Sequence, residues 1–203
     1  MIKKINFLFC LCFMAANAHS QGMGGGQQMY IPDVEVESFI WQVPAKWYPF
    51  SKESDVKIDA YLFPTGQEPT DFKQMLHFEE FRTTLGVTEA ISVYQLKTQA
   101  ASAACANTYE EKLEFNQMEN GYSMVQWSDS CISSNGSGSY GVTKAIVGNE
   151  KLYVAKKAWK FEPSEAERRK WLGVLRTVYV CDPRTGVNRC MPPGGAGGGG
   201  GRR

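Results

Sequence analysis

Hydrophobic and polar residues alternate in two segments in the first third of the chain. The segments VEVESFIWQV (34–43) and VKIDAYLF (56–63) alternate with a period of two, which is the pattern of strands with one buried face. Pro44, Pro49 and the charged run SKESD lie between them. These residues predict an irregular connection between the two strands.

The hydrophobic period changes in the following segment. Residues 70–86 place apolar side chains on one helical face, Asp71 and Gln74 fit a capping box, and Gly86 is a natural stop. The apolar residues of that face are Phe72, Met75, Leu76 and Phe81 or Leu85. The pattern predicts a helix here, and the β-branched and aromatic run AISVYQL (90–96) predicts a strand.

Two hairpins are expected next. The sequence Asn120-Gly121 is a strong hairpin signal, and Gly148-Asn149-Glu150 provides a second turn. The segment 99–110 is either a short helix or a loop, and 133–139 is the loop between the hairpins. The four hairpin strands are expected at 112–118, 122–131, 140–147 and 151–161.

A second helix is expected near the C-terminus. It starts at Pro163, with the capping-box spacing of Ser164 and Glu167, and Cys181-Asp182-Pro183 ends it. Its buried stripe comprises Trp171, Leu172, Leu175, Val178 and Tyr179. Consecutive strands joined by tight turns indicate an α+β fold, with an antiparallel sheet of about six or seven strands and two main helices packed on it.

The order of these elements, over about residues 34–181, resembles that of the Mog1/PsbP-like α/β/α sandwich. The likeness rests on element order, and no sequence motif carries it. This fold is common among small exported bacterial proteins. The resemblance implies a protein that binds other proteins or assists their assembly, which is an analogy at the level of the fold.

The N-terminus has the features of an export signal. Lys3 and Lys4 precede an apolar run at 5–14, and cleavage is expected after Ala18 or Ser20. The apolar run is shorter than the roughly 20 residues of a membrane-spanning helix. We therefore expect a signal peptide (1–18), a flexible Gly/Gln-rich segment (19–30), a single domain (31–191) and a disordered basic tail (192–203), in a periplasmic or secreted protein.

Export changes the interpretation of the cysteines. Cys10 and Cys12 are removed with the signal peptide, and four cysteines, an even number, remain in an oxidising compartment. Of the three connectivities, the local pairs Cys105–Cys131 and Cys181–Cys190 are predicted, because each lies at the ends of expected elements. The chain contains no C-x-x-C pair, which argues against zinc and against a redox-active thiol.

The charge balance excludes a general case for nucleic-acid binding. Without Lys3 and Lys4, 20 basic and 21 acidic residues remain. The residues are unevenly spread, since 30–82 hold ten acids and five bases, whereas 144–176 hold nine bases and four acids. We interpret both regions as solvated faces.

Candidate catalytic groups are few. His77 is expected to be a structural histidine, and neither Glu79/Glu80 nor Glu110/Glu111 forms an acid/base couple, because adjacent side chains point in different directions. A copper site on an N-terminal His19 is disfavoured, since flexible residues follow it. No catalytic residue, metal site or cofactor is predicted.

The surface for a partner is expected at Trp47 and Tyr48, in a proline-flanked loop, and at Arg184 and Arg189, in the loop that Cys181–Cys190 closes. The sequence thus predicts a non-enzymatic protein-binding or assembly module of the bacterial envelope or of a secretion system. Its partner would be another envelope or secreted protein. A secreted hydrolase with a dispersed site and a periplasmic small-molecule or metal-binding module are the alternatives.

Overall fold

The computed structural model describes residues 36–105, 108–133, 135–185 and 190. The expected signal peptide (1–18), the segment 19–30 and the tail 192–203 lie outside these residues, as do His19 and Arg189. Within the described part, no helix is long and apolar enough to cross a membrane.

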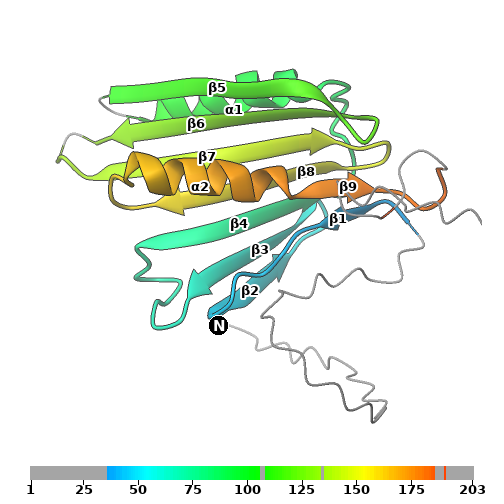
Figure 1. Cartoon of the computed structure of the whole chain (residues 1–203). Coiled ribbons are helices and arrows are strands. Elements are labelled where there is room, and N and C mark those ends of the chain that lie inside the picture. The colour runs from blue at the N-terminus through cyan, green and yellow to red at the C-terminus, as the bar shows by residue number, and fades with distance from the viewer. Residues whose placement is uncertain (1–35, 106–107, 134, 186–189, 191–203) are drawn as a thin grey trace, which may run out of the picture.

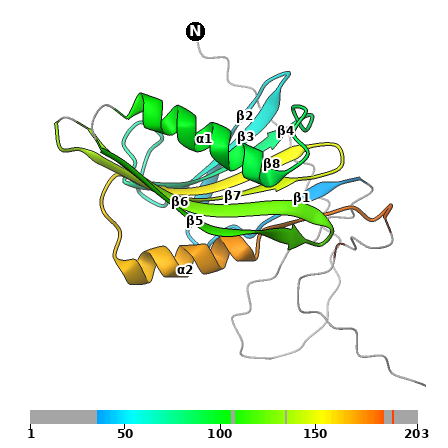
Figure 2. The same cartoon turned by 90° about the horizontal axis from the view of Figure 1, so that it is seen from above.

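A seven-stranded antiparallel sheet forms the centre of the molecule. In sheet order its strands are β2 (Trp47–Glu53), β3 (Lys57–Pro64), β4 (Gln74–Phe81), β8 (Leu152–Trp159), β7 (Gly138–Val147), β6 (Tyr122–Ile132) and β5 (Thr108–Glu119). Helix α1 (Ala90–Ala104) packs on β5, β6 and β7 from one side, and α2 (Glu165–Arg176) packs on β7 and β8 from the other (Figures 1 and 2). The predicted α+β class, with two helices on an antiparallel sheet, is confirmed.

A small second sheet lies on the same side as α2. It pairs β1 (Ser38–Ile40) antiparallel with β9 (Tyr179–Cys181), which directly follows the helix (Figure 1). Phe39 of β1 packs against the rings of Phe78 and Tyr153 in the main sheet. The two-stranded sheet therefore extends the α2 layer over the β4–β8 region.

The core has two parts, one on each side of the main sheet. On the α2 side it is built from large side chains: Leu62, Leu76, Phe78, Val142, Trp159, Trp171, Leu175 and Val178. On the α1 side smaller residues surround one tryptophan: Ala90, Val93, Val125, Trp127, Ala145, Val147, Leu152 and Val154. Burial on both sides explains why the central strands carry apolar residues at successive positions.

Local signals correctly placed the hairpins and the start of α2. Asn120 and Gly121 have φ values of 51° and 82°, so the β5–β6 turn uses the left-handed conformations that this dipeptide tolerates. The Ser164 side chain accepts a hydrogen bond from the Glu167 backbone N–H at 3.2 Å, as the capping-box spacing predicts. The helix ends earlier than expected, because Tyr179 belongs to β9.

Two element assignments from the sequence are wrong. The segment predicted to be a helix over 70–86 contains strand β4, and the segment predicted to be a strand over 90–96 begins helix α1. A third element, β2, occupies part of the expected irregular connection and tolerates Pro49 because it is an edge strand. In α1 the alanine-rich second half favours a helix, and packing of Ala90 and Val93 against β6 and β7 stabilises the helical conformation of the β-branched first turns.

Both predicted disulfides are present in the structure. Cys105–Cys131 joins the end of α1 to β6, and Cys181–Cys190 closes the loop after β9, with sequence separations of 26 and 9. The four sulfur atoms are therefore bonded in pairs, which leaves none of them as a zinc ligand.

Candidate functional site

The α1 side of the main sheet is covered by a helix over only part of its width. Helix α1 lies over β5, β6 and β7, whereas β2, β3 and β4 extend beyond it (Figure 2). We call the α1 side of these three strands the open face. Alternation along β3 and β4 turns Lys57, Asp59 and Tyr61, and His77 and Glu79, to this side.

An ionic cluster lies on the open face, and five residues form it: Lys57, Asp59, His77, Glu79 and Lys97. The Lys57 ammonium bridges two carboxylates, at 2.9 Å from Asp59 Oδ1 and 2.5 Å from Glu79 Oε1. Lys97, from α1, contacts the second oxygen of Glu79 at 2.5 Å, and His77 Nε2 lies 2.8 Å from Asp59 Oδ1.

The cluster shifts the pKa values of its members. Burial alone would raise the pKa of Glu79, but Lys97 and Lys57 lower it to about 2. Burial lowers the pKa of His77, although the hydrogen bond to Asp59 opposes this shift. Burial would also lower the pKa of Lys57, but its hydrogen bonds to Glu79 and Asp59 raise it. At neutral pH the shifts therefore keep the Glu79 carboxylate and the Lys57 ammonium charged beside a neutral His77 imidazole.

Aromatic rings surround the cluster. Tyr61 stacks on the His77 ring, with centroids 4.2 Å apart and an angle of 7° between the planes. Phe50 of β2 packs against Tyr61 and is 49% exposed. The Phe81 ring lies under both ammonium groups, 5.4 Å from Lys57 Nζ and 5.8 Å from Lys97 Nζ, an arrangement in which the ring attracts the cations.

The charges of the open face are unequally exposed. The side chains of Lys57 and Lys97 are 28% and 36% exposed, whereas those of Asp59 and Glu79 are 10% and 9% exposed. Lys52, which is opposite Asp59 in the register, is also exposed. The open face therefore presents positive charge and aromatic surface to solvent and keeps its carboxylates inside.

The Asp59–His77 pair resembles the orienting half of a nucleophilic triad, in which the histidine must also contact a nucleophile. Within the described residues, the His77 side chain makes one hydrogen bond, to Asp59. The same three groups, Asp59, His77 and Glu79, each offer a metal-ligating atom, and these atoms lie within 4.8 Å of one another.

A fully buried lysine, Lys157, lies on the opposite side of the sheet. Lys157 is 0% exposed, and its ammonium lies 4.6 to 4.9 Å from the ring centroids of Trp47, Trp159 and Trp171. Its hydrogen-bond partner is Gln74 Oε1, at 2.6 Å. Burial lowers the pKa of Lys157 to about 7, against the attraction of Glu167. Among the described residues no carboxylate forms an ion pair with this ammonium, and Gln74 and the three rings are its polar and aromatic contacts.

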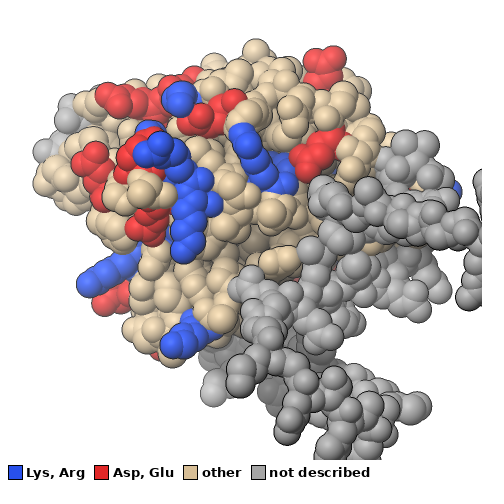
Figure 3. All heavy atoms as spheres, viewed as in Figure 1, with Lys and Arg blue, Asp and Glu red and all other residues tan. Residues whose placement is uncertain are grey.

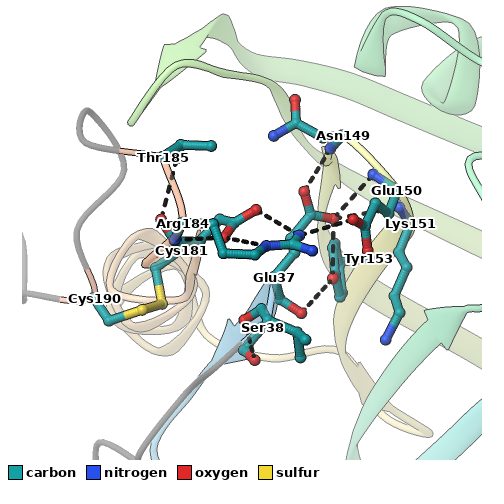
Figure 4. A network of polar contacts seen from close by, with 12 residues as sticks. Glu37, Ser38, Asn149, Glu150, Lys151, Tyr153, Cys181, Arg184, Thr185 and Cys190 are labelled. Carbon is teal, nitrogen blue, oxygen red and sulfur yellow. Dashed lines mark hydrogen bonds and ion pairs between the residues drawn. A yellow bond between two sulfur atoms is a disulfide. The ribbon is translucent and has the colours of Figure 1, made fainter.

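A polar network ties β1 to the β7–β8 turn and is shown in Figure 4. The buried carboxylate of Glu37 accepts hydrogen bonds from the backbone N–H groups of Asn149 (2.6 Å), Glu150 and Lys151 (3.3 Å each). The Tyr153 hydroxyl donates to the same carboxylate at 3.2 Å. The network explains how a segment before the first strand is fixed to the sheet.

The predicted partner residues are dispersed. Trp47 and Tyr48 lie in strand β2 rather than in a loop, and Trp47 packs against Trp171 on the α2 side while Tyr48 lies on the open face. Arg184 is 45% exposed and pairs with Asp182 and Glu150 at 2.7 and 2.8 Å (Figure 4). Their role in binding a partner stays a prediction.

The predicted excess of basic residues over 144–176 does not produce a patch of one sign on the α2 side. In the view that faces α2, Lys and Arg side chains are interspersed with Asp and Glu (Figure 3). Several pairs account for this, such as Arg168 with Glu165 and Arg184 with Glu150. This is the pattern of a solvated face.

The sequence did not reveal the ionic cluster. Its members come from β3, β4 and α1, and the helical interpretation of 70–86 placed His77 and Glu79 on different faces. One signal was available: Asp59 with Tyr61, and His77 with Glu79, are spaced by two residues, which places each pair on one face of a strand.

Comparisons with known proteins identify the fold. No known protein family matches the sequence, and no curated protein matches it either. The solution structure of cyanobacterial PsbP (CyanoP) from Synechocystis sp. PCC 6803 superposes with a TM-score of 0.51 at 10% identity, covering 79% of this chain and 98% of CyanoP. This chain shares the PsbP fold. The resemblance to the Mog1/PsbP-like sandwich is thereby confirmed at the level of the fold.

A second similar structure is that of LpqN from Mycobacterium tuberculosis, which is described as involved in cell envelope biogenesis. It has a TM-score of 0.46 and 13% identity, and the alignment covers 73% of this chain and 86% of LpqN. At 10% identity the likeness to CyanoP shows the fold alone and leaves the function to be argued from the site itself.

Proposed function

We propose that the protein is an exported, non-enzymatic module that binds another envelope or secreted protein through the open face. The observation that carries this proposal is the unequal exposure of charge there, with lysines 28% and 36% exposed beside carboxylates near 10%. The exposed ring of Phe50, packed on Tyr61, adds an apolar contact to the open face. A positive surface with an exposed aromatic ring fits an acidic segment of a partner protein.

Export is supported by two independent features. The N-terminal sequence has the pattern of a signal peptide, with Lys3 and Lys4 before an apolar run. The disulfides Cys105–Cys131 and Cys181–Cys190 suit an oxidising compartment. The PsbP fold is compatible with a binding role, and this support is by analogy.

Site-specific photo-crosslinking in the producing cells would test the proposal. A photoreactive phenylalanine analogue replaces Phe50, and the matched control carries it at Arg169, which is 71% exposed on α2. We expect one adduct of defined mass from position 50 and none from position 169. The substitution Lys52→Glu should abolish this adduct, because it reverses a charge next to the contact.

Binding of the identified partner is then measured with purified proteins. We expect the affinity to fall as salt rises above about 0.1 M, where the Debye length is about 10 Å. Adducts of equal yield at both positions, or an affinity insensitive to both salt and Lys52→Glu, would contradict a role for the open face.

A further inference from the structure

We propose that Asp59, His77 and Glu79 form a binding site for a divalent transition-metal ion such as zinc, and that the ammonium of Lys57 takes the place of the ion when none is bound. This inference does not depend on the proposed function, because a metal site could serve folding or binding equally.

The donor set suits the ion. One imidazole nitrogen and two carboxylate oxygens are common zinc ligands, with bond lengths of about 2.0–2.2 Å. Tetrahedral ligands at these bond lengths lie about 3.3–3.6 Å from one another. In the structure, His77 Nε2 and Asp59 Oδ1 are 2.8 Å apart, and all three ligand atoms lie within 4.8 Å. Side-chain rotations that change these separations by about an ångström would bring them to the required range.

The backbone already holds the ligands in place. Asp59 and Glu79 are directly opposite each other on β3 and β4, and Tyr61 is opposite His77. The Tyr61 ring stacked on His77 fixes the imidazole plane. Lys97 holds the second oxygen of Glu79 at 2.5 Å and so orients the carboxylate, leaving Oε1 to face the site. Neighbours that orient the ligands in this way strengthen metal sites.

Lys57 occupies the position between the two carboxylates. Its Nζ lies 2.9 Å from Asp59 Oδ1 and 2.5 Å from Glu79 Oε1, as a cation shared by both would. The side chain is 28% exposed, and a long lysine stem can swing its ammonium into water. His77 would then bind through Nε2 in the tautomer that carries its hydrogen on Nδ1.

If Lys57 and the ion compete for one position, removing Lys57 must strengthen the binding of zinc. An ordinary salt-bridge cluster would not show this effect. The protein, with both disulfides formed, is titrated with Zn²⁺ by calorimetry, in competition with a chromophoric chelator. Every sample carries His19→Gln, so that the second histidine of the chain cannot contribute. We expect one ion per chain, loss of that binding in His77→Gln, and an affinity at least about tenfold higher in Lys57→Met, because a positive charge near the ion is removed.

The control is Glu80→Gln, because Glu80 lies on the other side of β4 and pairs with Lys151. It should leave the affinity unchanged. The proposal would be overturned if zinc binding persists in His77→Gln or if Lys57→Met does not increase the affinity. It would also be overturned if neither the protein with Lys57 intact nor the Lys57→Met variant binds zinc at millimolar concentration. Nitrogen NMR of the His77 ring in a protein with Lys57 and Glu79 intact provides a second measurement that does not depend on how the variants fold. We expect zinc to shift the Nε2 resonance of His77, and an unshifted resonance would also overturn the proposal.

Discussion

Lys157 allows the electrostatics of the core to be tested by pH. The folded chain releases the proton of Lys157 at a pKa of about 7, whereas the unfolded chain keeps it up to a pKa of about 10.4. Between these values the unfolded state binds more protons, so raising the pH stabilises the folded state. Burial of the charged Lys157 ammonium thus destabilises the folded state fully below pH 7, and this destabilisation disappears as the pH approaches 10.4.

The magnitude follows from the shift. Each pH unit inside this window changes the free energy of unfolding by about 1.4 kcal/mol. Between about pH 7 and pH 9 the lysine should therefore contribute about 2–3 kcal/mol of added stability. Lys157→Met removes the titrating group while keeping a side chain of similar length among the three tryptophans.

Urea unfolding of both proteins near pH 6, 7.5 and 9 is the measurement. We expect the advantage of the methionine variant over the wild type to be largest near pH 6 and to shrink by about 2–3 kcal/mol near pH 9. The variant leaves Gln74 without its lysine donor at every pH, so this loss lowers the stability of the variant throughout the range. Lys170→Met, on the exposed side of α2, is the control and should show no trend. A difference independent of pH would refute the reasoning, because the rings would then be solvating the ammonium as well as water does.

Two further predictions concern the anchoring of the chain ends. Replacing Cys181 and Cys190 by alanine should lower the free energy of unfolding by about 2.7 kcal/mol on the loop-entropy model. Urea unfolding measures this, and an unchanged midpoint would contradict it. Gly148→Ala should destabilise the protein by about 2 kcal/mol or more, because the added methyl group would overlap the carboxylate of Glu37. Thermal unfolding with Gly173→Ala as control, where the new methyl group meets open space, should show the loss only at position 148.

Local chemistry made part of the fold predictable. Asn120-Gly121 and Ser164 each determine a conformation through their own backbone or side chain, so both were placed correctly. The export signal indicated an oxidising compartment, and this made disulfides between neighbouring cysteines predictable. For Asn120-Gly121 and Ser164 the decisive interaction lies within a few residues along the chain, and for Cys181–Cys190 it lies within one loop. Cys105–Cys131 has a sequence separation of 26 and was predicted because both cysteines lie at the ends of expected elements.

The strand β4 could not be predicted in this way. Leu76 and Phe78 face the α2 side, whereas the part-buried His77 and the buried Glu79 face the open side as members of an ionic cluster. The alternation of apolar and polar residues covers only Leu76 to Glu79, and the apolar residues of 70–86 also fit one helical face, so the pattern did not distinguish a strand from a helix. The compensating charge comes from Lys57, 22 residues away in sequence, so no local pattern contains it.

Helix α1 shows the opposite failure. Its first turns carry Ile91 and Val93, and its N-cap, Glu89, makes no side-chain hydrogen bond to the helix. A helix without a capping signal and with β-branched residues at its start has the local appearance of a strand. Packing of Ala90 and Val93 against β6 and β7 decides the matter, and this contact exists only once the sheet has formed.

The pairing of β1 with β9 has a mechanical consequence. In their antiparallel register Ser38 is opposite Cys181, so a pull on the two ends of the domain enters both strands at the same point. Such a load peels the hydrogen bonds apart one after another instead of shearing them together. The Cys181–Cys190 disulfide carries tension directly into β9 and bypasses the loop between them. Under load the hydrogen bonds of Glu37 and those of the two-stranded sheet would therefore break first, while the seven-stranded sheet stays intact.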